Sequence, residues 1–392
     1  MSAGIEDASP DSRPARPQPW LLLFVLPAVL GGAGRLIKGG WWLNDFDAVA
    51  CAAWRAARHL PLYATALACP GGRPSAYVYL PQVAWSLAPL AHAPTVSGLR
   101  LAYGLAYAGV MAWLTFTLYG RTRLARFSPV PLLVLVTGAT IAYGNLAAPC
   151  HALVLVAARL RRRRPALLTA AILAAGLVKP VFLAYVLIFV FDDAPMRTRS
   201  RRVLIALALA AGLAALMALT GGEALIEWRR SLDQVVLGEQ WGVGLLDDMA
   251  RLGLRADQFM AQAVWAVYAA LLILAAMAFA EARRLDGTAR LLLAIAIAQL
   301  CNPRLMSYDL IMVGPGLAAI AGSASPDLRR PLWLALLGVC SLLLLVNLAE
   351  LKAVEIRLGP PLLAGFVLVA AGLEVRRGRR GAAIGGQAVR AA

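Results

Sequence analysis

The chain has 392 residues, of which 60% are apolar and 15% are charged, and its formal net charge is +17. Soluble domains average about 45–50% apolar and about 25% charged residues, so this composition indicates a membrane protein and excludes a large soluble domain. A net charge of this size on a soluble chain would indicate nucleic-acid binding. Here the basic residues form short clusters between apolar runs, which is typical of cytoplasmic loops and argues against a nucleic-acid partner.

The predicted organisation is a single polytopic membrane domain over residues 19–374. Residues 1–18 are expected to form a disordered cytoplasmic N-terminus, and residues 375–392 a basic cytoplasmic tail. A helix needs about 20 apolar residues to cross a hydrocarbon core, and the alternating pattern of barrel strands is absent. After a first span at Trp20–Gly34, the clearest spanning runs are Val203–Thr220, Gln258–Glu281, Leu332–Leu348 and Pro360–Leu373.

Clusters of arginine between the apolar runs predict the topology. Basic loops stay in the cytoplasm, so each stretch between two clusters must cross the membrane an even number of times. This rule predicts an all-α protein of about 12 spans with both termini cytoplasmic, in a bacterial inner membrane. The clusters are Arg121–Arg126, Arg159–Arg164, Arg197–Arg202, Arg283–Arg290, Arg329–Arg330 and Arg376–Arg380.

Three of the apolar stretches are predicted to be tight hairpins with polar residues at the turn. Their arms of about 11–15 residues are short for a core of about 30 Å, so the turns are expected below the outer surface. The stretches are Pro129–Ala158, Ala166–Phe191 and Leu291–Ile320, and they turn at Gly144-Asn145, Lys179-Pro180 and Asn302-Pro303-Arg304.

Two of these turns carry a cation, which turn chemistry does not explain. Asn145 and Pro303 are residues that turns commonly contain. By contrast, Lys179 and Arg304 place positive charge at the outer side, against the bias of the rest of the chain. Polar groups at membrane depth are costly and usually functional, so we expect both cations to have a function. Asp309 is either the ion partner of Arg304 or a further site residue.

The loop after the first span, residues 35–76, is predicted to contain an interfacial helix that Asn44 or Asp45 caps. Its apolar and polar residues separate at helical spacing into two faces. The apolar face comprises Phe46, Val49, Ala50, Ala53, Trp54, Ala57 and Leu60, and the polar face comprises Asp47, Cys51, Arg55, Arg58 and His59.

The side of the membrane on which this loop lies depends on the next predicted helix, Tyr77–Ala91. If that helix does not span, the loop is outside, and if it spans, the loop is inside. Arg35 and Lys38 favour the inside, whereas the short length and two prolines of the helix favour the outside. Cys51 and Cys69 can pair if the loop faces an oxidising compartment, and two free thiols are the alternative.

Several short motifs follow one another over residues 40–325. They are Asn44-Asp45-Phe46, Ala52-Ala53, Leu60-Pro61-Leu62-Tyr63, Tyr77-Val78-Tyr79-Leu80-Pro81, Gly144-Asn145, Gly176-Leu177-Val178-Lys179-Pro180, and Asn302-Pro303-Arg304 with Tyr308-Asp309. Their order resembles that of the GT-C membrane glycosyltransferases of family 87, which include polyprenyl-phosphate-mannose-dependent α-mannosyltransferases. Asn145 stands where the family usually has Gln, and no histidine follows Pro303, where many relatives have one.

The resemblance implies transfer of a hexose from a polyprenyl phosphate to a lipid or glycan acceptor hydroxyl on the outer face, with mannose as the first candidate for the hexose. It implies inversion at the sugar carbon, with no nucleotide, cofactor or metal. Asp45 would be the general base, with Asp47 as the alternative. Lys179 and Arg304 would bind the donor phosphate as its negative charge grows. The possible supporting residues are Asn145, Tyr79, Tyr308 and Asp309.

A secondary transporter or flippase is the main alternative, because broken helices with polar turns also occur in transporters. Against it, the second half of the chain does not repeat the first, and the three polar turns lie on one side. A scaffold without chemistry is a third possibility. The second outer loop, residues 221–257, is either a plain surface loop or shapes acceptor binding through Glu227, Trp228, Gln240 and Trp241.

Overall fold

The computed structural model describes residues 43–63, 67, 69–92, 96–119, 130–136, 144–236, 242–348 and 352–391. These parts are helical, apart from turns and one isolated bridge between Leu67 and Ser75. The first predicted span, the polar N-terminus, Arg35, Lys38, Gln240 and Trp241 lie outside the described residues. The expectation of an all-α protein is confirmed for the described part of the chain.

Five helices in the described part of the chain are long and apolar enough to cross a membrane, each with at least 21 such residues. At 1.5 Å per residue, 21 residues extend about 30 Å, the thickness of a hydrocarbon core. These helices contain all four runs that the sequence singled out. They are α4 (Val96–Tyr119), α9 (Met196–Thr220), α12 (Phe259–Ala282), α15 (Pro326–Leu348) and α16 (Lys352–Ala391).

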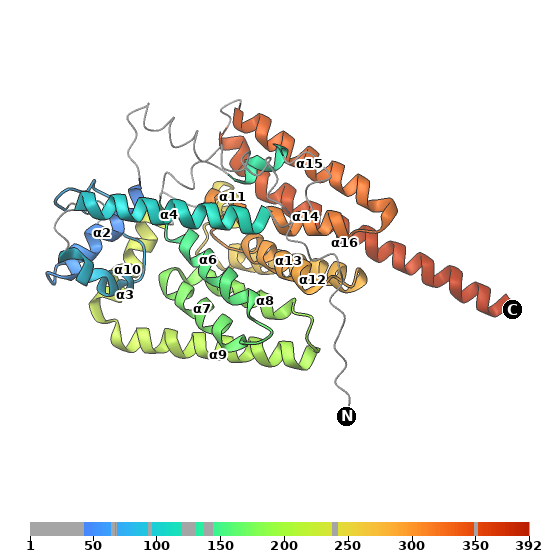
Figure 1. Cartoon of the computed structure of the whole chain (residues 1–392), viewed down its shortest axis with the longest axis horizontal. Coiled ribbons are helices and arrows are strands. Elements are labelled where there is room, and N and C mark those ends of the chain that lie inside the picture. The colour runs from blue at the N-terminus through green and yellow to red at the C-terminus, as the bar shows by residue number, and fades with distance from the viewer. Residues whose placement is uncertain are drawn as a thin grey trace, which may run out of the picture.

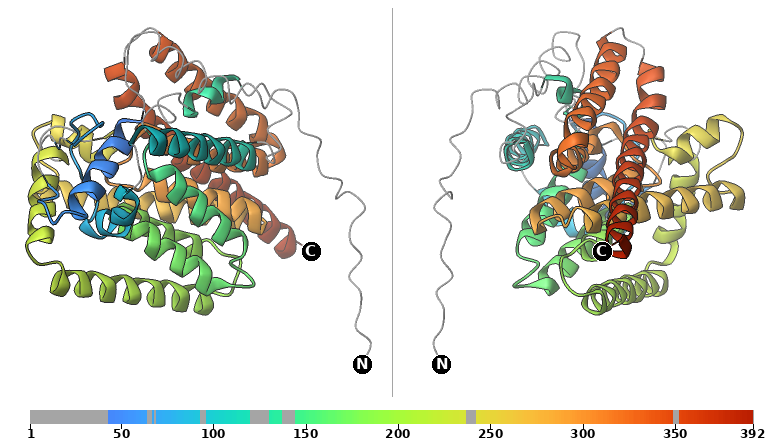
Figure 2. Two further views of the ribbon diagram at one scale, coloured as in Figure 1. Left: turned by 60° about the vertical axis from the view of Figure 1, so that its left-hand side comes forward. Right: turned by 90° about the vertical axis from the view of Figure 1, so that its right-hand side faces the viewer.

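Two of the long helices show how the bundle meets its surroundings. On α9 only Ala206 is buried among the described neighbours, so nearly the whole apolar surface of this helix is available to lipid. Figure 1 shows α9 along one edge of the molecule. Helix α16 continues without a break through the predicted basic tail to Ala391, and Figure 2 shows it leaving the bundle toward the C-terminus.

The described helices are interrupted at the three predicted turns, and a short helix follows each of them; residues 137–143, before the first turn, lie outside the described residues. Helix α6 (Ala147–Arg159) begins directly after Asn145. Helix α7 (Pro165–Val178) ends at Lys179, where Pro180 opens the 3₁₀ helix η5 (Pro180–Val186), which continues into α8 (Leu187–Val190). Helix α13 (Gly287–Leu300) precedes the third turn, and η7 (Ser307–Met312) and α14 (Gly314–Ser323) follow it. The short 3₁₀ helix η4 (Val130–Leu135) packs against α15.

Helix α13 forms the centre of the bundle. Ten of its 14 residues are buried, and it packs against α14, α8 and α12. A central helix surrounded by protein does not need to reach both lipid surfaces, which explains how a helix of about 21 Å can be accommodated. Figure 1 shows α13 between α12 and α6.

Ion pairs and hydrogen bonds gather four of the six basic clusters at one end of the described bundle, which we call the basic end. It comprises residues 159–164, 192–202, 281–290 and 323–329. Asp192 pairs with Arg161 and Arg202, and Glu281 pairs with Arg199 and Arg290. The Arg283 guanidinium donates a hydrogen bond to the Ser323 carbonyl. Helices α2, α3 and α10 lie together at the opposite end (Figure 1).

The predicted interfacial helix exists, but its cap and its two faces are corrected. Helix α2 (Asn44–Ala56) begins after Leu43, which occupies the N-cap position, so Asn44 and Asp45 are the first two residues of the helix instead of its cap. Asp47 and Cys51, expected on the exposed polar face, are buried because each has a tertiary partner, Arg100 and Cys69 respectively. Leu60 lies beyond the helix and is 40% exposed.

The segment predicted as a helix over Tyr77–Ala91 is shorter than expected. Helix α3 (Pro81–Leu87) starts at the first proline and passes into the 3₁₀ helix η2 (Ala88–His92). Pro81 disfavours helical geometry at Leu80, which is extended, so Tyr77–Leu80 stay outside the helix. Seven α-helical residues extend about 10 Å, which favours the non-spanning alternative.

The segment predicted as the second outer loop packs on the segment predicted as the first, and we keep these names for the two segments. Helix α10 (Gly222–Ser231) is followed by a π-helical turn (Leu232–Val236) and, after a gap, by α11 (Leu245–Arg251). The Trp228 indole donates a hydrogen bond to the Val78 carbonyl (3.2 Å), and the Ser231 hydroxyl donates to the Tyr77 carbonyl (3.2 Å). Trp228 is therefore a structural contact between the two loops.

Candidate functional site

A chain of hydrogen bonds joins four of the predicted site residues, and they come from four segments far apart in the sequence. The Asn145 amide donates to the Asp45 carboxylate (Nδ2–Oδ2, 2.5 Å). The Lys179 ammonium donates to Asn145 Oδ1 (2.8 Å) and to the Tyr308 hydroxyl (3.1 Å). The first outer loop and all three polar turns thus meet at one site, which we call the polar cluster.

Asn145 is held in place by its own turn. Its Oδ1 accepts the backbone N–H of Ala147 (2.9 Å), which satisfies one free donor of the first turn of α6. Gly144 has a φ of +63°, and a Cβ atom there would lie 2.6 Å from Leu43 Cδ2, so this position requires glycine. The Tyr103 hydroxyl on α4 donates to the Gly144 carbonyl (2.6 Å).

Lys179 reaches the cluster because α7 stops at that residue. Its backbone is extended and Pro180 follows, so the side chain turns away from the helix axis. The ammonium lies 5.2 Å from the ring centroid of Tyr79 and 5.4 Å from that of Tyr308. The half-buried Lys179 ammonium is therefore held by one amide oxygen, one phenol hydroxyl and two aromatic rings, and none of these groups carries a negative charge.

Arg304 lies at the edge of the same cluster, within electrostatic range of Tyr308, Tyr79 and Asp45. Its backbone N–H donates to Asn302 Oδ1 (2.9 Å), which holds the third turn together. The second outer loop contacts the chain just after this turn, because the Val243 N–H donates to the Leu305 carbonyl (2.7 Å).

Asp309 has partners that the sequence did not suggest. Its Oδ1 lies 2.9 Å from His151 Nε2, and its Oδ2 accepts the Met306 N–H (3.1 Å). On the other side of the imidazole, Nδ1 lies 2.6 Å from the Tyr185 hydroxyl. Tyr185, His151 and Asp309 are all buried, and Asp309 directly follows Tyr308 in the chain.

His151 is the site residue that sequence reasoning missed. A buried imidazole requires partners, and a histidine six residues after Asn145 on an otherwise apolar helix was the available signal. No histidine follows Pro303 in the sequence, but the fold brings one from α6 to the segment that follows this proline.

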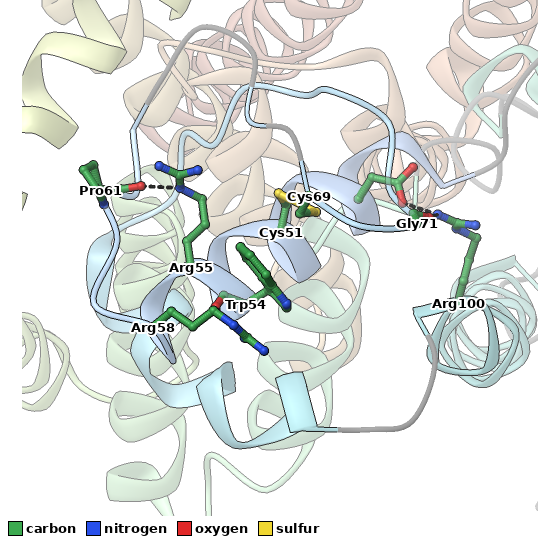
Figure 3. Close-up of a disulfide and its surroundings, with 9 residues drawn as sticks. Cys51, Trp54, Arg55, Arg58, Pro61, Cys69, Gly71 and Arg100 are labelled. Atoms are coloured by element: carbon green, nitrogen blue, oxygen red, sulfur yellow. Dashed lines mark hydrogen bonds and ion pairs between the residues drawn. A yellow bond between two sulfur atoms is a disulfide. The ribbon is translucent and has the colours of Figure 1, made fainter.

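Asp47, the alternative general base, is committed to a structural contact. Its carboxylate is almost fully buried and pairs with Arg100 of α4 at 2.5 Å, and the same guanidinium donates to the Gly71 carbonyl (3.0 Å). A disulfide joins Cys51 to Cys69 beside it, and Figure 3 shows Cys51–Cys69 and Arg100 fastening the loop to α2. Of the two aspartates, Asp45 is the one that contacts the polar cluster.

An apolar groove of about 340 Å³ lies beside the Lys179-Pro180 turn. Helices α7 and α9 form its walls with η5 and α10, and Leu80, Pro180 and Met217 are among the lining residues. A Cβ atom at Gly176 would lie 2.8 Å from Leu183, so glycine there permits the close packing of α7 on η5. The groove lies between the lipid-facing helix α9 and the turn that carries Lys179.

In the described part of the chain, no three His, Cys, Asp or Glu side chains are grouped closely enough to hold a metal ion. The polar cluster, with Arg304 and Tyr79 beside it, offers a carboxylate, two cations and two phenol hydroxyls, which suit an anionic or hydroxyl-bearing ligand. No family model, curated protein or solved structure matches this chain.

Proposed function

We propose that this protein is a membrane glycosyltransferase that moves a hexose from a polyprenyl phosphate to a lipid or glycan hydroxyl. Mannose is the first candidate for the hexose. The observation that carries the proposal is the polar cluster, in which Asp45 and Lys179 both bind Asn145. A carboxylate beside a cation is what a transfer from a phosphate to a hydroxyl requires.

In the proposed reaction, Asp45 accepts the proton of the acceptor hydroxyl as its oxygen attacks the anomeric carbon. The bond between that carbon and the phosphate oxygen breaks on the opposite face, and the phosphate leaves with the electron pair. Lys179 and Arg304 stabilise the negative charge that grows on the phosphate. Attack and departure on opposite faces invert the sugar carbon.

Asn145 has a specific use in this reaction. Its amide stands between the Asp45 carboxylate and the Lys179 ammonium, donating to one and accepting from the other. A direct ion pair would make the carboxylate a weaker base and would occupy the cation that the phosphate needs. The Asn145 amide links the carboxylate and the ammonium at one site.

The apolar groove beside Lys179-Pro180 supports a lipid-linked donor. A polyprenyl chain entering from the bilayer past α9 would bring its phosphate to the turn that carries Lys179. Tyr79 and Tyr308 would line the sugar, because aromatic rings pack on the apolar faces of hexoses while their hydroxyls bond to polar edges.

We propose that the cluster faces the outer side of a bacterial plasma membrane, in a protein of about 12 spans with cytoplasmic termini. The separation of the basic end from the polar cluster supports this orientation, as does the Cys51–Cys69 disulfide, since disulfides persist in oxidising compartments. A transporter or flippase remains the alternative, although transporter sites lie near the middle of the membrane.

The deciding experiment supplies membranes containing the protein with radiolabelled polyprenyl phosphate mannose and with matched glucose and galactose donors. Consumption of one donor, lost in the Lys179→Met variant, is the expected result. If none of the donors is consumed while vesicles containing the protein accumulate or flip a labelled lipid, the transporter alternative is correct. The products of the consumed donor identify the sugar, the acceptor and the linkage.

A further inference from the structure

A second, larger cavity lies at the basic end, away from the polar cluster. Its volume is about 740 Å³, within the range of small-molecule sites. Helix α6 connects the two places, with Asn145 just before its first residue and Arg159 as its last, which separates them by about 20 Å. This cavity therefore does not belong to the proposed glycosyltransferase site.

The lining of the cavity is divided by chemistry. Its apolar wall includes Leu118, Leu155 and Trp333, from α4, α6 and α15, and its rim carries Arg159, Arg161 and Thr288. Leu118 and Trp333 lie toward the ends of helices long enough to span a membrane, so the apolar wall lies near the boundary between the apolar spans and the basic end. A ligand that fits must have an anionic group and an apolar chain.

The charges of the described lining residues sum to a net positive charge. The charged lining residues are two arginines and Asp286. Asp286 is occupied as the cap of α13, accepting the N–H groups of Thr288 (2.8 Å) and Ala289 (2.9 Å). Asp192, the partner of Arg161, is shared with Arg202, so two cations divide one carboxylate.

Arg161 is buried and held by hydrogen bonds, whereas Arg159 is exposed beside an aromatic ring. The Arg161 guanidinium donates to the Gly287 carbonyl (2.6 Å), and the Arg159 guanidinium lies 5.8 Å from the ring centroid of Trp113. Next to Arg159, Val156 and Leu160 are 46% and 39% exposed, which indicates that this face of α6 meets lipid. A cationic rim above an apolar wall is what a lipid headgroup requires.

We propose that this cavity binds an anionic phospholipid, with the headgroup phosphate at Arg159 and Arg161 and an acyl chain along Leu118 and Trp333. The site is independent of the glycosyltransferase function. The rim carries the charge typical of the cytoplasmic face, so the lipid comes from the inner leaflet, where a bound anionic lipid would join α4 to α6 and α13.

The test uses the full chain, purified in detergent and stripped of lipid, with binding followed by native mass spectrometry. The probes are dioleoyl phosphatidylglycerol, dioleoyl phosphatidylcholine and inorganic phosphate. Two variants alter the cavity: Arg159→Gln removes a rim charge, and Gly322→Leu fills the space. A Cβ atom at Gly322 meets nothing within 4 Å, so Gly322→Leu is expected to fold. The matched controls are Arg201→Gln and Gly212→Leu on α9, outside the cavity.

We expect the wild-type chain and both controls to retain phosphatidylglycerol in preference to phosphatidylcholine. Arg159→Gln should bind it about tenfold more weakly, the effect of one charged hydrogen bond, and Gly322→Leu should bind none. Equal binding of the two lipids, or unchanged binding in both cavity variants, overturns the proposal. Displacement of the lipid by millimolar inorganic phosphate also overturns it, since the site would then recognise free phosphate.

Discussion

Asp45→Asn is the substitution that separates catalysis from structure at the polar cluster. The N-cap position of α2 is Leu43, so the substitution leaves the N-cap residue unchanged. Its contact with Asn145 changes from a charged to a neutral acceptor, a loss of about 1 kcal/mol. Its favourable interaction with the first turn of α2 contributes about 0.3–1 kcal/mol more. The folded protein should therefore lose only about 1–2 kcal/mol of stability.

The expected effect on the reaction is much larger than this structural effect. An amide cannot accept the proton of the acceptor hydroxyl, so turnover at saturating donor should fall at least ~100-fold. That corresponds to about 2.7 kcal/mol in the activation barrier, since each factor of ten is about 1.36 kcal/mol. The assay compares turnover, donor binding and thermal unfolding in one detergent. Folded Asp45→Asn protein that retains wild-type turnover would refute the assignment of the base.

Asp47 provides the matched control, but not as a single substitution. Asp47→Asn alone leaves the Arg100 guanidinium without its carboxylate, and it should destabilise the protein for that reason. The double variant Asp47→Asn with Arg100→Gln removes both charges together and should retain turnover per folded molecule. Loss of turnover in the folded double variant would assign the base to Asp47.

The remaining predictions concern the phosphate cation, the buried histidine, the disulfide and the topology. Lys179→Met should weaken use of limiting donor by about 2–4 kcal/mol while protein level is nearly unchanged, and wild-type kinetics at limiting donor would make Lys179 structural. His151→Leu leaves Asp309 and Tyr185 without their shared partner, so its free energy of chemical unfolding should fall by about 2–4 kcal/mol. His151→Gln should be intermediate in stability, and equal stability of the wild type and both variants would contradict the network. Reduction of the Cys51–Cys69 disulfide, or the double variant Cys51→Ala with Cys69→Ala, should lower the temperature at which the first outer loop unfolds. The measurement is the temperature at which a protease begins to cleave at Arg73. Unchanged cleavage would mean that Arg100 alone holds the loop. Pro74 is exposed, whereas the three free cysteines are buried, so an impermeant thiol reagent should label the Pro74→Cys variant from outside intact cells. Labelling only after permeabilisation would contradict the proposed topology.

Much of the architecture follows from the sequence because membrane helices obey local rules. The spans at Val203, Gln258, Leu332 and Pro360 need only an apolar run of sufficient length, and the structure contains all four. The turns at Asn145, Lys179 and Pro303 were predictable because glycine, proline and polar residues interrupt the apolar pattern there. The choice of Lys179, Asn145 and Tyr308 as members of one site came from the family resemblance and from the charge bias.

Tertiary structure decided what depends on partners from distant segments. The helical periodicity of α2 placed Asp47 and Cys51 toward solvent, because local pattern cannot reveal that Arg100 and Cys69 reach them. The same limit hid His151, whose meaning depends on Asp309, 158 residues later. It also hid the position of Asn145, which bonds to both Asp45 and Lys179 only after α2 and two of the turns have met. Sequence composition determines which segments enter the membrane, since transfer from water depends on each segment alone. The pairing of polar groups inside it is decided by the folded chain, because a buried donor or acceptor must find whichever partner the packing brings near.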